Sequence, residues 1–235
     1  MLCLCDYRTP ADVLSSLKER GFETLLMPAD PSLPDPVNGH VDLIVFIYRG
    51  DITVRHDYYR QNKALIDAIC KKSKMHLRPS YSSASKKYPF DCGLCAAVVG
   101  EKFLYCTKST DISLISRFDT LGYKSIDLPQ GYVKCSCALL ADGAIITADR
   151  GIAKITQAEG IDTLMITPGH IDLPGYDYGF IGGASGLCGN TLYFSGNLEL
   201  HPDSEAIKDF ALKHGTKCVS LGENKLYDVG SLVFI

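Results

Sequence analysis

The sequence of 235 residues predicts an α/β protein, and more specifically a five-bladed α/β propeller whose units each consist of strand, strand, helix and strand. One observation is that this order of patterns recurs along the chain, as in other proteins built from repeated units. A second is that the two ends of the chain supply complementary parts of one unit. A third is that glycines, which can take the left-handed conformation that ends a helix, follow four expected helices, at Gly21, Gly122, Gly160 and Gly215. A three-layer α/β sandwich is the alternative fold.

The clearest unit spans residues 131–166. Residues 132–140 alternate between apolar and polar side chains, and after a turn that contains Gly143 the chain returns as a second strand. Asp149 can cap the next helix, because its carboxylate can accept hydrogen bonds from free backbone N–H groups of the first turn. Gly160 ends that helix, and an apolar third strand follows at 163–166.

Three more units show the same order of hairpin, capped helix and third strand. Their helices are expected to begin at Asp57, at Ser109 or Thr110, and at Pro202 and Asp203. Their strands are expected, unit by unit, at 42–48, 52–54 and 76–78; at 95–99, 103–106 and 125–128; and at 179–187, 192–195 and 217–221.

The two ends of the chain complete a fifth unit. Residues 2–5 and 23–27 are expected strands on either side of a helix, but no first strand precedes them. Residues 226–235 are a strand without a partner of its own. Pairing the two ends closes the ring and removes exposed sheet edges. The Pro-rich stretch 28–40 and the Ser-rich stretch 79–89 are expected loops, so we expect one domain over residues 1–235.

Composition limits the partners. The net charge is −3 and the sequence pI is about 6.1, so no basic surface for nucleic acid is expected. Neither a long apolar run nor a secretory signal is present, so we expect a cytoplasmic protein that does not bind membranes. The ten cysteines then behave as reduced, small apolar residues without structural disulfides. Nothing in the sequence determines the oligomeric state.

The first strands of the units are expected to surround a central channel, so that stretches 91–95, 134–137, 182–185 and 227–231 converge on one site. Cys135 and Cys137 should share a face, and either could be a nucleophile, although buried strand thiols also serve as packing residues. The spacing of these cysteines from the Cys92–Cys95 pair does not fit a zinc ribbon or finger. At Gly182 and Gly183 either a ligand or another backbone must approach closely.

Two histidines are candidates outside the channel strands. His201 is followed by Asp203 at the start of a helix, which indicates either a helix cap or a catalytic His–Asp pair. His170 lies in an insertion at 167–178 that could cover the mouth of the channel, where binding residues are commonly found.

Five strand–strand–helix–strand units in a ring, together with the segment GFIGGASG at residues 179–186, resemble the pentein fold. Arginine and agmatine deiminases, dimethylarginine hydrolases and amidinotransferases share that fold, as does a non-catalytic ribosome anti-association factor. In those enzymes the nucleophilic cysteine lies in the last unit, and a histidine closely followed by an acidic residue lies on an earlier channel strand. This chain has Asp228 and Ser231 in its last unit, with no cysteine after Cys218. The resemblance therefore implies either a rearranged site or a ring that binds without catalysis.

The resemblance, together with the cysteines expected at the channel, implies a cysteine-dependent hydrolase or transferase that acts on a small amidine, guanidine or amide in the central channel. The alternative is a non-catalytic module of the same fold that binds a small molecule or a protein. No metal ligand and no cofactor are expected. The expected catalytic residues are Cys137, Cys135 and His201, and the expected substrate-binding residues are Asp91, Gly182, Gly183, Ser185, Asp228, Ser231 and His170.

Overall fold

The structure is a computed structural model that describes residues 1–81 and 84–235, so part of the loop expected at 79–89 lies outside the described residues. Within these residues the strands form five three-stranded sheets. In each sheet the middle strand pairs antiparallel with one neighbour and parallel with the other. The fold is therefore mixed α/β with small sheets.

The strands, sheet by sheet, are β15 (Val233–Phe234), β1 (Leu2–Asp6) and β2 (Glu23–Met27); β3 (Val45–Tyr48), β4 (Asp51–Arg55) and β5 (His76–Ser80); β6 (Ala97–Val99), β7 (Lys102–Tyr105) and β8 (Lys124–Asp127); β9 (Cys137–Leu139), β10 (Ile145–Thr147) and β11 (Thr163–Met165); β12 (Ser185–Cys188), β13 (Thr191–Phe194) and β14 (Lys217–Ser220). The helices are α1 (Ala11–Glu19), α2 (Val41–Ile44), α3 (His56–Gln61), α4 (Lys63–Ser73), α5 (Ile112–Thr120), α6 (Val133–Ser136), α7 (Arg150–Ala158) and α8 (Ser204–Lys213), with 3₁₀ turns η1 (Asp35–Val37) and η2 (Leu198–Leu200).

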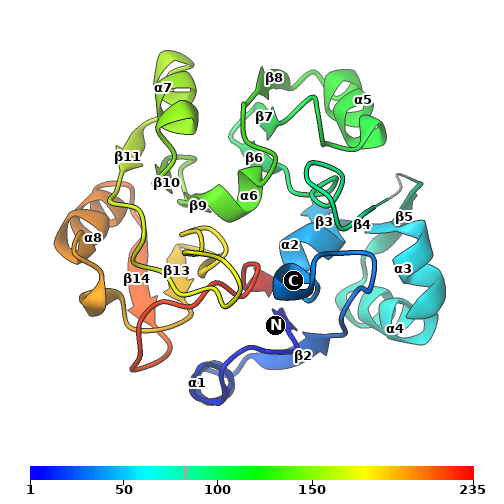
Figure 1. Ribbon diagram of the computed structural model, residues 1–235, viewed down its shortest axis with the longest axis horizontal. Coiled ribbons are helices and arrows are strands. Elements are labelled where there is room, and N and C mark those ends of the chain that lie inside the picture. Colours follow the sequence, from blue (N-terminus) through cyan, green and yellow to red (C-terminus); the bar gives the residue numbers. More distant parts are fainter. Residues whose placement is uncertain (82–83) are drawn as a thin grey trace.

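The helices that join the middle strand of each sheet to its third strand lie on the outside. A parallel pair of strands cannot be joined by a tight turn and needs a crossover, which these helices provide. Figure 1 shows α1, α4, α5, α7 and α8 at the rim, with the sheets between them and the centre of the molecule. The inner ends of the sheets therefore face one another.

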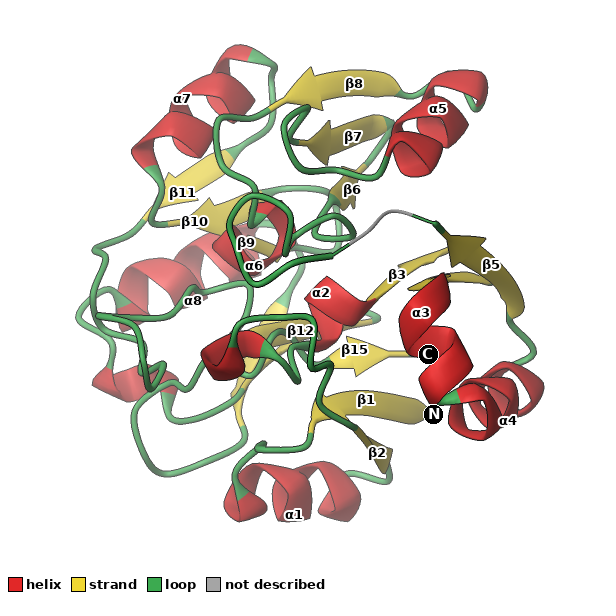
Figure 2. Cartoon of the chain, turned by 45° about the vertical axis from the view of Figure 1, so that its right-hand side comes forward, coloured by secondary structure: helices red, strands yellow, loops and turns green. Residues whose placement is uncertain are grey.

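Both ends of the chain contribute to the first sheet. Cys3 lies opposite Phe234 in an antiparallel pairing, and the backbone groups of Leu2 and Ile235 exchange two hydrogen bonds of 2.9 Å. Figure 2 shows β1 and β15 side by side. The prediction that the first and last segments share a sheet is confirmed.

Helix ends follow the predicted signals closely. Asp149 caps α7 by accepting a hydrogen bond from the Ile152 N–H at 2.9 Å. The cap of α5 is Asp111, which accepts from the Ser113 N–H at 2.7 Å, rather than Ser109 or Thr110. The predicted glycine stops take positive φ angles, at Gly21 (82°), Gly122 (76°), Gly160 (72°) and Gly215 (64°).

The first strands of the units are shorter than predicted. Instead of strands across 42–48 and 132–140, the one-turn helices α2 and α6 precede β3 and β9. Residues 179–184 likewise precede β12 without being a strand, and β15 covers only the end of 226–235. Every residue of α2 is buried, so this segment has no solvent-exposed face. The spacing of apolar residues alone cannot distinguish a short buried strand from a helical turn.

Apolar side chains fill the space between neighbouring sheets. Phe46 of β3 contacts Phe103 of β7 with ring centroids 6.3 Å apart, and Ile146, Phe194 and Ile207 belong to one cluster that joins the fourth and fifth sheets. This packing fixes the sheets relative to one another, and therefore fixes the segments that enter the centre. No helix in residues 1–81 or 84–235 has the length and apolar character needed to cross a membrane.

Candidate functional site

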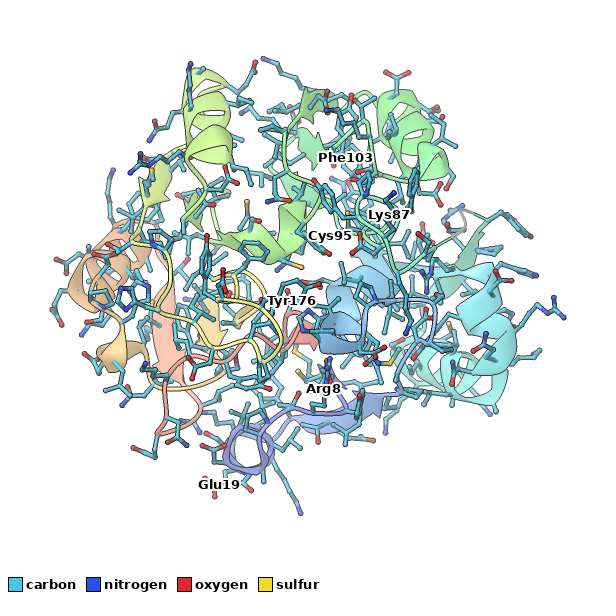
Figure 3. All side chains as sticks on the ribbon, in the orientation of Figure 1. Arg8, Glu19, Lys87, Cys95, Phe103 and Tyr176 are labelled. Carbon is cyan, nitrogen blue, oxygen red and sulfur yellow. The ribbon has the colours of Figure 1, made fainter. Side chains whose placement is uncertain are left out.

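A small cavity lies where the segments preceding the inner strands meet. Its volume is about 90 Å³, well above the roughly 10–15 Å³ that one water molecule requires. Figure 3 shows Tyr176, which lines it, near the centre of the molecule, and Phe103 farther out. The lining consists of three titratable groups and a largely aromatic and apolar wall: His40, Cys135 and Asp228, with Val37, Tyr132, Leu173, Tyr176, Tyr178 and Phe180.

Three separate segments bring the titratable groups together. His40 precedes α2, Cys135 belongs to α6, and Asp228 precedes β15. The Nδ1 atom of His40 lies 3.8 Å from Asp228 Oδ1, and the ligand atoms of His40, Asp42 and Cys135 all lie within 4.8 Å of one another. All four residues are at most 3% exposed, so the charges interact in surroundings that water screens weakly.

The carboxylate of Asp228 is held by backbone N–H groups. Oδ2 accepts from Phe180 at 2.8 Å and Oδ1 accepts from Gly230 at 2.9 Å. Burial raises the pKa of Asp228 to about 6, although both hydrogen bonds favour the ionised form. Gly230 has a φ of 63°, and a Cβ there would lie 2.2 Å from the His40 Cβ, so glycine is required for His40 to reach this place.

The glycines at 182 and 183 are explained by close packing. A Cβ on Gly182 would lie 2.2 Å from the carbonyl oxygen of Lys134 and 2.4 Å from that of Cys137. The N–H of Gly183 donates to the Cys135 carbonyl at 2.9 Å, and a Cβ on Gly183 would lie 2.0 Å from Asp228 Oδ1. The predicted close approach is therefore made by another backbone and by the Asp228 carboxylate. The two glycines allow the backbone of residues 182–183 to pack against α6 and Asp228, and they do not line the cavity themselves.

Ser231 connects two charged side chains next to the cavity. Its Oγ lies 2.6 Å from Asp42 Oδ2 and 2.8 Å from the Gly182 carbonyl oxygen, so its one proton can go to either acceptor. The Lys134 ammonium donates to the same Oγ at 2.9 Å. The Ser185 hydroxyl also points to the Gly182 carbonyl, at 3.5 Å. Ser231 and Ser185 thus hold the framework of the site and do not line the cavity.

The buried thiol of Cys135 is protonated at neutral pH. Burial is the main reason that its pKa lies well above the ordinary value, and the Cys95 thiol and the Asp42 and Asp228 carboxylates add to this. The two sulfur atoms of Cys95 and Cys135 are 3.5 Å apart. Burial also lowers the pKa of His40, which is therefore neutral and able to accept a proton.

Cys137 does not share a face with Cys135. It begins β9 and packs in an apolar cluster with Val99 and Ile145, and burial raises its pKa to about 12. The prediction of a common strand face was wrong because Cys135 lies on a helical turn, where the two side chains do not alternate as in a strand. Only Cys135 of this pair lines the cavity.

Asp91 acts on the cavity through a tyrosine. The Tyr132 hydroxyl donates a hydrogen bond to Asp91 Oδ2, and the Tyr132 ring lines the cavity. Burial, followed by this hydrogen bond, raises the pKa of Tyr132. The predicted convergence of the channel segments therefore holds for Asp91 and Asp228, although Asp91 is not itself part of the cavity wall.

His201 and His170 lie elsewhere. Their rings contact each other with centroids 5.5 Å apart, and the Nδ1 atom of His201 accepts a hydrogen bond from the Asp203 backbone N–H at 3.1 Å. Figure 1 places the following helix, α8, at the rim. Neither histidine lines the cavity. The loop at 167–178 does reach the cavity, but through Tyr176 and Tyr178.

The prediction missed His40. It follows the Pro-rich loop, whose composition suggested only a surface connection. A usable signal was present, because His40 is followed two residues later by Asp42, immediately before an apolar run. This is the His-then-acid pattern that the pentein resemblance implies for a channel strand.

Two larger cavities adjoin the site. One of about 610 Å³ shares Tyr176, Tyr178 and Phe180 with the small cavity and is also lined by Asp149 and Arg150. Another of about 390 Å³ is lined mainly by inner-strand residues of β3, β6, β9 and β15, and it contains Asp42 and Lys134. Asp42 and Lys134, which both hydrogen-bond Ser231, therefore line this third space.

Comparison with solved structures identifies the fold. A DDAH (dimethylarginine dimethylaminohydrolase) from Pseudomonas aeruginosa complexed with citrulline is 11% identical, with a TM-score of 0.56 over 94% of this chain and 91% of that chain. An agmatine deiminase from C. jejuni is 10% identical, with a TM-score of 0.56 over 94% and 87%. An amidinotransferase from Microseira wollei is 10% identical, with a TM-score of 0.54 over 89% and 72%. These are pentein proteins, and this chain has their fold.

A search of curated proteins gave no match. One family model covers residues 4–233, which is nearly the whole chain and includes every residue of the site described above. The chain belongs to this family, which is described as a family of unknown function (DUF6873).

Proposed function

We propose that the protein is a cysteine-dependent hydrolase or transferase that acts on a small guanidine or amidine, with Cys135 as nucleophile and His40 as proton acceptor. The observation that carries this proposal is the convergence of Cys135, His40 and Asp228 on one 90 Å³ cavity. In this proposal the chain is a single domain, a five-bladed α/β propeller with the cavity at its centre. The fold shared with DDAH, agmatine deiminase and amidinotransferase structures supports it.

The charges around Cys135 favour a cationic substrate. Asp42 and Asp228 both disfavour the Cys135 thiolate, so the empty site holds a thiol. A guanidinium next to these carboxylates reverses this effect. Two unit charges 4 Å apart interact by about 4 kcal/mol at an effective dielectric constant near 20, equal to about three pKa units. Substrate binding would thus activate the nucleophile, and an apo enzyme would keep an unreactive thiol.

The reaction follows from the positions of the two groups. The Cys135 proton passes to His40, and the thiolate sulfur attacks the amidine carbon, forming an S–C bond. The C–N bond then breaks, and the leaving nitrogen takes the proton from His40 and departs as ammonia or an amine. Water, deprotonated by His40, attacks the same carbon, the S–C bond breaks, and the sulfur recovers its proton. Asp228 accepts hydrogen bonds from the substrate N–H groups during both steps.

The neighbouring cavity suits the rest of the substrate. It shares Tyr176, Tyr178 and Phe180 with the reaction cavity, so one molecule can extend from one space into the other. Because the reaction cavity is only about 90 Å³, we expect it to admit the guanidine group alone. Arg150 in the larger cavity can bind an anionic end of such a molecule.

The test compares two alkylating reagents of nearly equal shape, cationic 2-chloroacetamidine and neutral 2-chloroacetamide. The native protein is treated with each, and the modified cysteines are mapped over time by mass spectrometry. We expect the cation to label Cys135 at least about 10-fold faster than the neutral reagent, because only the cation gains from Asp42 and Asp228. The partly buried thiols Cys188 and Cys218 should react with both reagents at similar rates and serve as internal standards.

Matched variants sharpen the result. Asp228→Asn should abolish most of the preference for the cation, whereas Cys137→Ala should leave the labelling of Cys135 unchanged. Release of ammonia or amine from a panel of guanidines should then be lost in Cys135→Ala. Labelling of Cys135 that is no faster with the cation, together with no turnover of any guanidine, would refute the proposal in favour of a non-catalytic binding module.

A further inference from the structure

We propose that His40, Asp42 and Cys135 form a binding site for Zn²⁺. Their ligand atoms lie within 4.8 Å of one another, and they come from two segments far apart in the sequence, the start of α2 and α6. The proposal rests on this arrangement and does not depend on the reaction proposed above. If both are right, zinc inhibits the enzyme, because the metal and the reaction need the same sulfur and imidazole.

The carboxylate of Asp42 supplies an independent observation. The side chain is 3% exposed, and its Oδ1 atom has no hydrogen-bond partner among the described residues. The other oxygen, Oδ2, accepts from Ser231, whose hydroxyl is itself held by Lys134. A buried carboxylate oxygen without a donor is costly, and a cation is the partner that would satisfy it. Through Oδ2, Ser231 and Lys134 hold the Asp42 carboxylate in one orientation, which also fixes the position of Oδ1.

The donor set selects the metal. One imidazole nitrogen, one carboxylate oxygen and one thiolate sulfur suit Zn²⁺, whereas Mg²⁺ and Ca²⁺ need oxygen ligands throughout. Bond lengths of about 2.0–2.3 Å place tetrahedral ligand atoms about 3.3–3.8 Å apart. The separations of up to 4.8 Å therefore require a contraction of about an ångström, which rotation of three side chains can provide. Three protein ligands leave a fourth position for water or substrate.

Two neighbouring groups are assigned supporting roles. Cys95 lies 3.5 Å from the Cys135 sulfur, so its thiol can donate a hydrogen bond to the metal-bound thiolate. Ser231 holds Asp42 in place through Oδ2. Hydrogen-bonding partners of this kind typically change metal affinity by about 10–100-fold. Cys95 and Ser231 should therefore tune the affinity for metal without abolishing it.

The test uses untagged protein, freed of metal with a chelator and titrated with Co²⁺ as a spectroscopic probe. Tetrahedral Co²⁺ with a thiolate ligand gives visible absorption and a near-ultraviolet sulfur-to-metal band. We expect both bands to saturate at one equivalent and to disappear when Zn²⁺ is added. Zinc should also protect Cys135 from alkylation, which can be measured whether or not the protein turns over a substrate.

The variants are chosen to keep the fold. Cys135→Ala should remove the sulfur-to-metal band, and the nearly isosteric changes His40→Gln and Asp42→Asn should weaken binding by more than about 100-fold, beyond the effect of outer partners. Ser231→Ala should weaken it by about 10-fold, and Cys137→Ala should bind as the wild type does. Circular dichroism confirms folding in each case. Metal bands that persist in Cys135→Ala, or the absence of binding at millimolar Co²⁺ in the folded wild type, would overturn the proposal.

Discussion

Replacing Gly182 with alanine measures how tightly the glycine-rich segment packs on α6. The added Cβ would lie 2.2, 2.4 and 2.7 Å from the carbonyl oxygens of Lys134, Cys137 and Cys135. All three atoms belong to the backbone and cannot move aside by a side-chain rotation. Overpacking of this kind costs about 1–3 kcal/mol, and displacement of the hydrogen bond from the Gly183 N–H to the Cys135 carbonyl adds about 1 kcal/mol.

The expected loss is therefore about 3 kcal/mol, a large fraction of the roughly 5–15 kcal/mol that stabilises a typical protein. For a chain of this size it lowers the melting temperature by about 6–12 °C. The assay is reversible urea unfolding followed by circular dichroism, with calorimetry for the melting temperature. A loss of less than about 1 kcal/mol would show that the backbones at Gly182 and α6 are not in tight contact. The glycine would then be explained by the close approach of a ligand instead.

Gly93→Ala is the matched control. The nearest atom to its added Cβ would be the Ser109 carbonyl oxygen at 3.6 Å, an ordinary van der Waals distance, and its φ angle is not in the left-handed region. Alanine there reduces the freedom of the unfolded chain, so we expect a gain of about 0.4–1 kcal/mol. The two variants make the same chemical change. If Gly182→Ala lowers the free energy of unfolding and Gly93→Ala raises it, the loss at Gly182 comes from the clash with the three carbonyl oxygens.

Three other predictions concern buried polar groups. Asp228→Asn should lower the free energy of unfolding in urea by about 2 kcal/mol, because one amide oxygen cannot replace both carboxylate oxygens that accept from backbone N–H groups. An unchanged unfolding midpoint would contradict those hydrogen bonds. Tyr132→Phe should cost about 1–3 kcal/mol, because buried Asp91 loses its donor, and a fully stable variant would refute that contact. Burial lowers the pKa of His201 in the folded protein, so its contribution to stability is complete above the unfolded pKa near 6.5 and is lost as the pH falls through the folded pKa. Wild type should therefore lose stability relative to His201→Gln between pH 7 and pH 5, and parallel pH profiles would contradict this.

The sequence allowed much of the framework to be predicted, because the signals for it are local. Gly21, Gly122, Gly160 and Gly215 ended helices as expected, since a positive φ is easy only for glycine. The pairing of β1 with β15 followed from an N-terminal unit that lacked its first strand and a C-terminal strand that lacked a partner. The helix stops are set by immediate neighbours in sequence, whereas the pairing of the two ends follows from the strand order that recurs along the chain.

The site was predicted less well because tertiary contacts determine it. Cys135 and Asp228 were named, but α6 was taken for a strand, since a segment buried on all sides has no polar face that reveals its period. His40 was missed because its surroundings, Cys135 and Asp228, are distant in the sequence and come near only in the fold. His201 was named as a catalytic candidate because of its neighbour in the sequence, yet it does not line the cavity. Asp203 precedes α8, and the His201 Nδ1 lies 4.0 Å from its carboxylate, but neither residue lines the cavity.

The pairing of β1 with β15 also sets an order of events during folding. Cys3 contacts Phe234, so this sheet closes a loop of almost the entire chain. Closing about 230 residues costs about 3 kcal/mol more entropy than closing a ten-residue hairpin, and contacts between distant residues form slowly. Asp228 and Ser231 enter the centre with the same segment. A chain emerging from the ribosome can therefore form its other four sheets first, and the cavity lined by His40, Cys135 and Asp228 is completed only when the segment that carries Asp228 is free. Until then the nascent protein lacks Asp228 and cannot carry out the proposed chemistry.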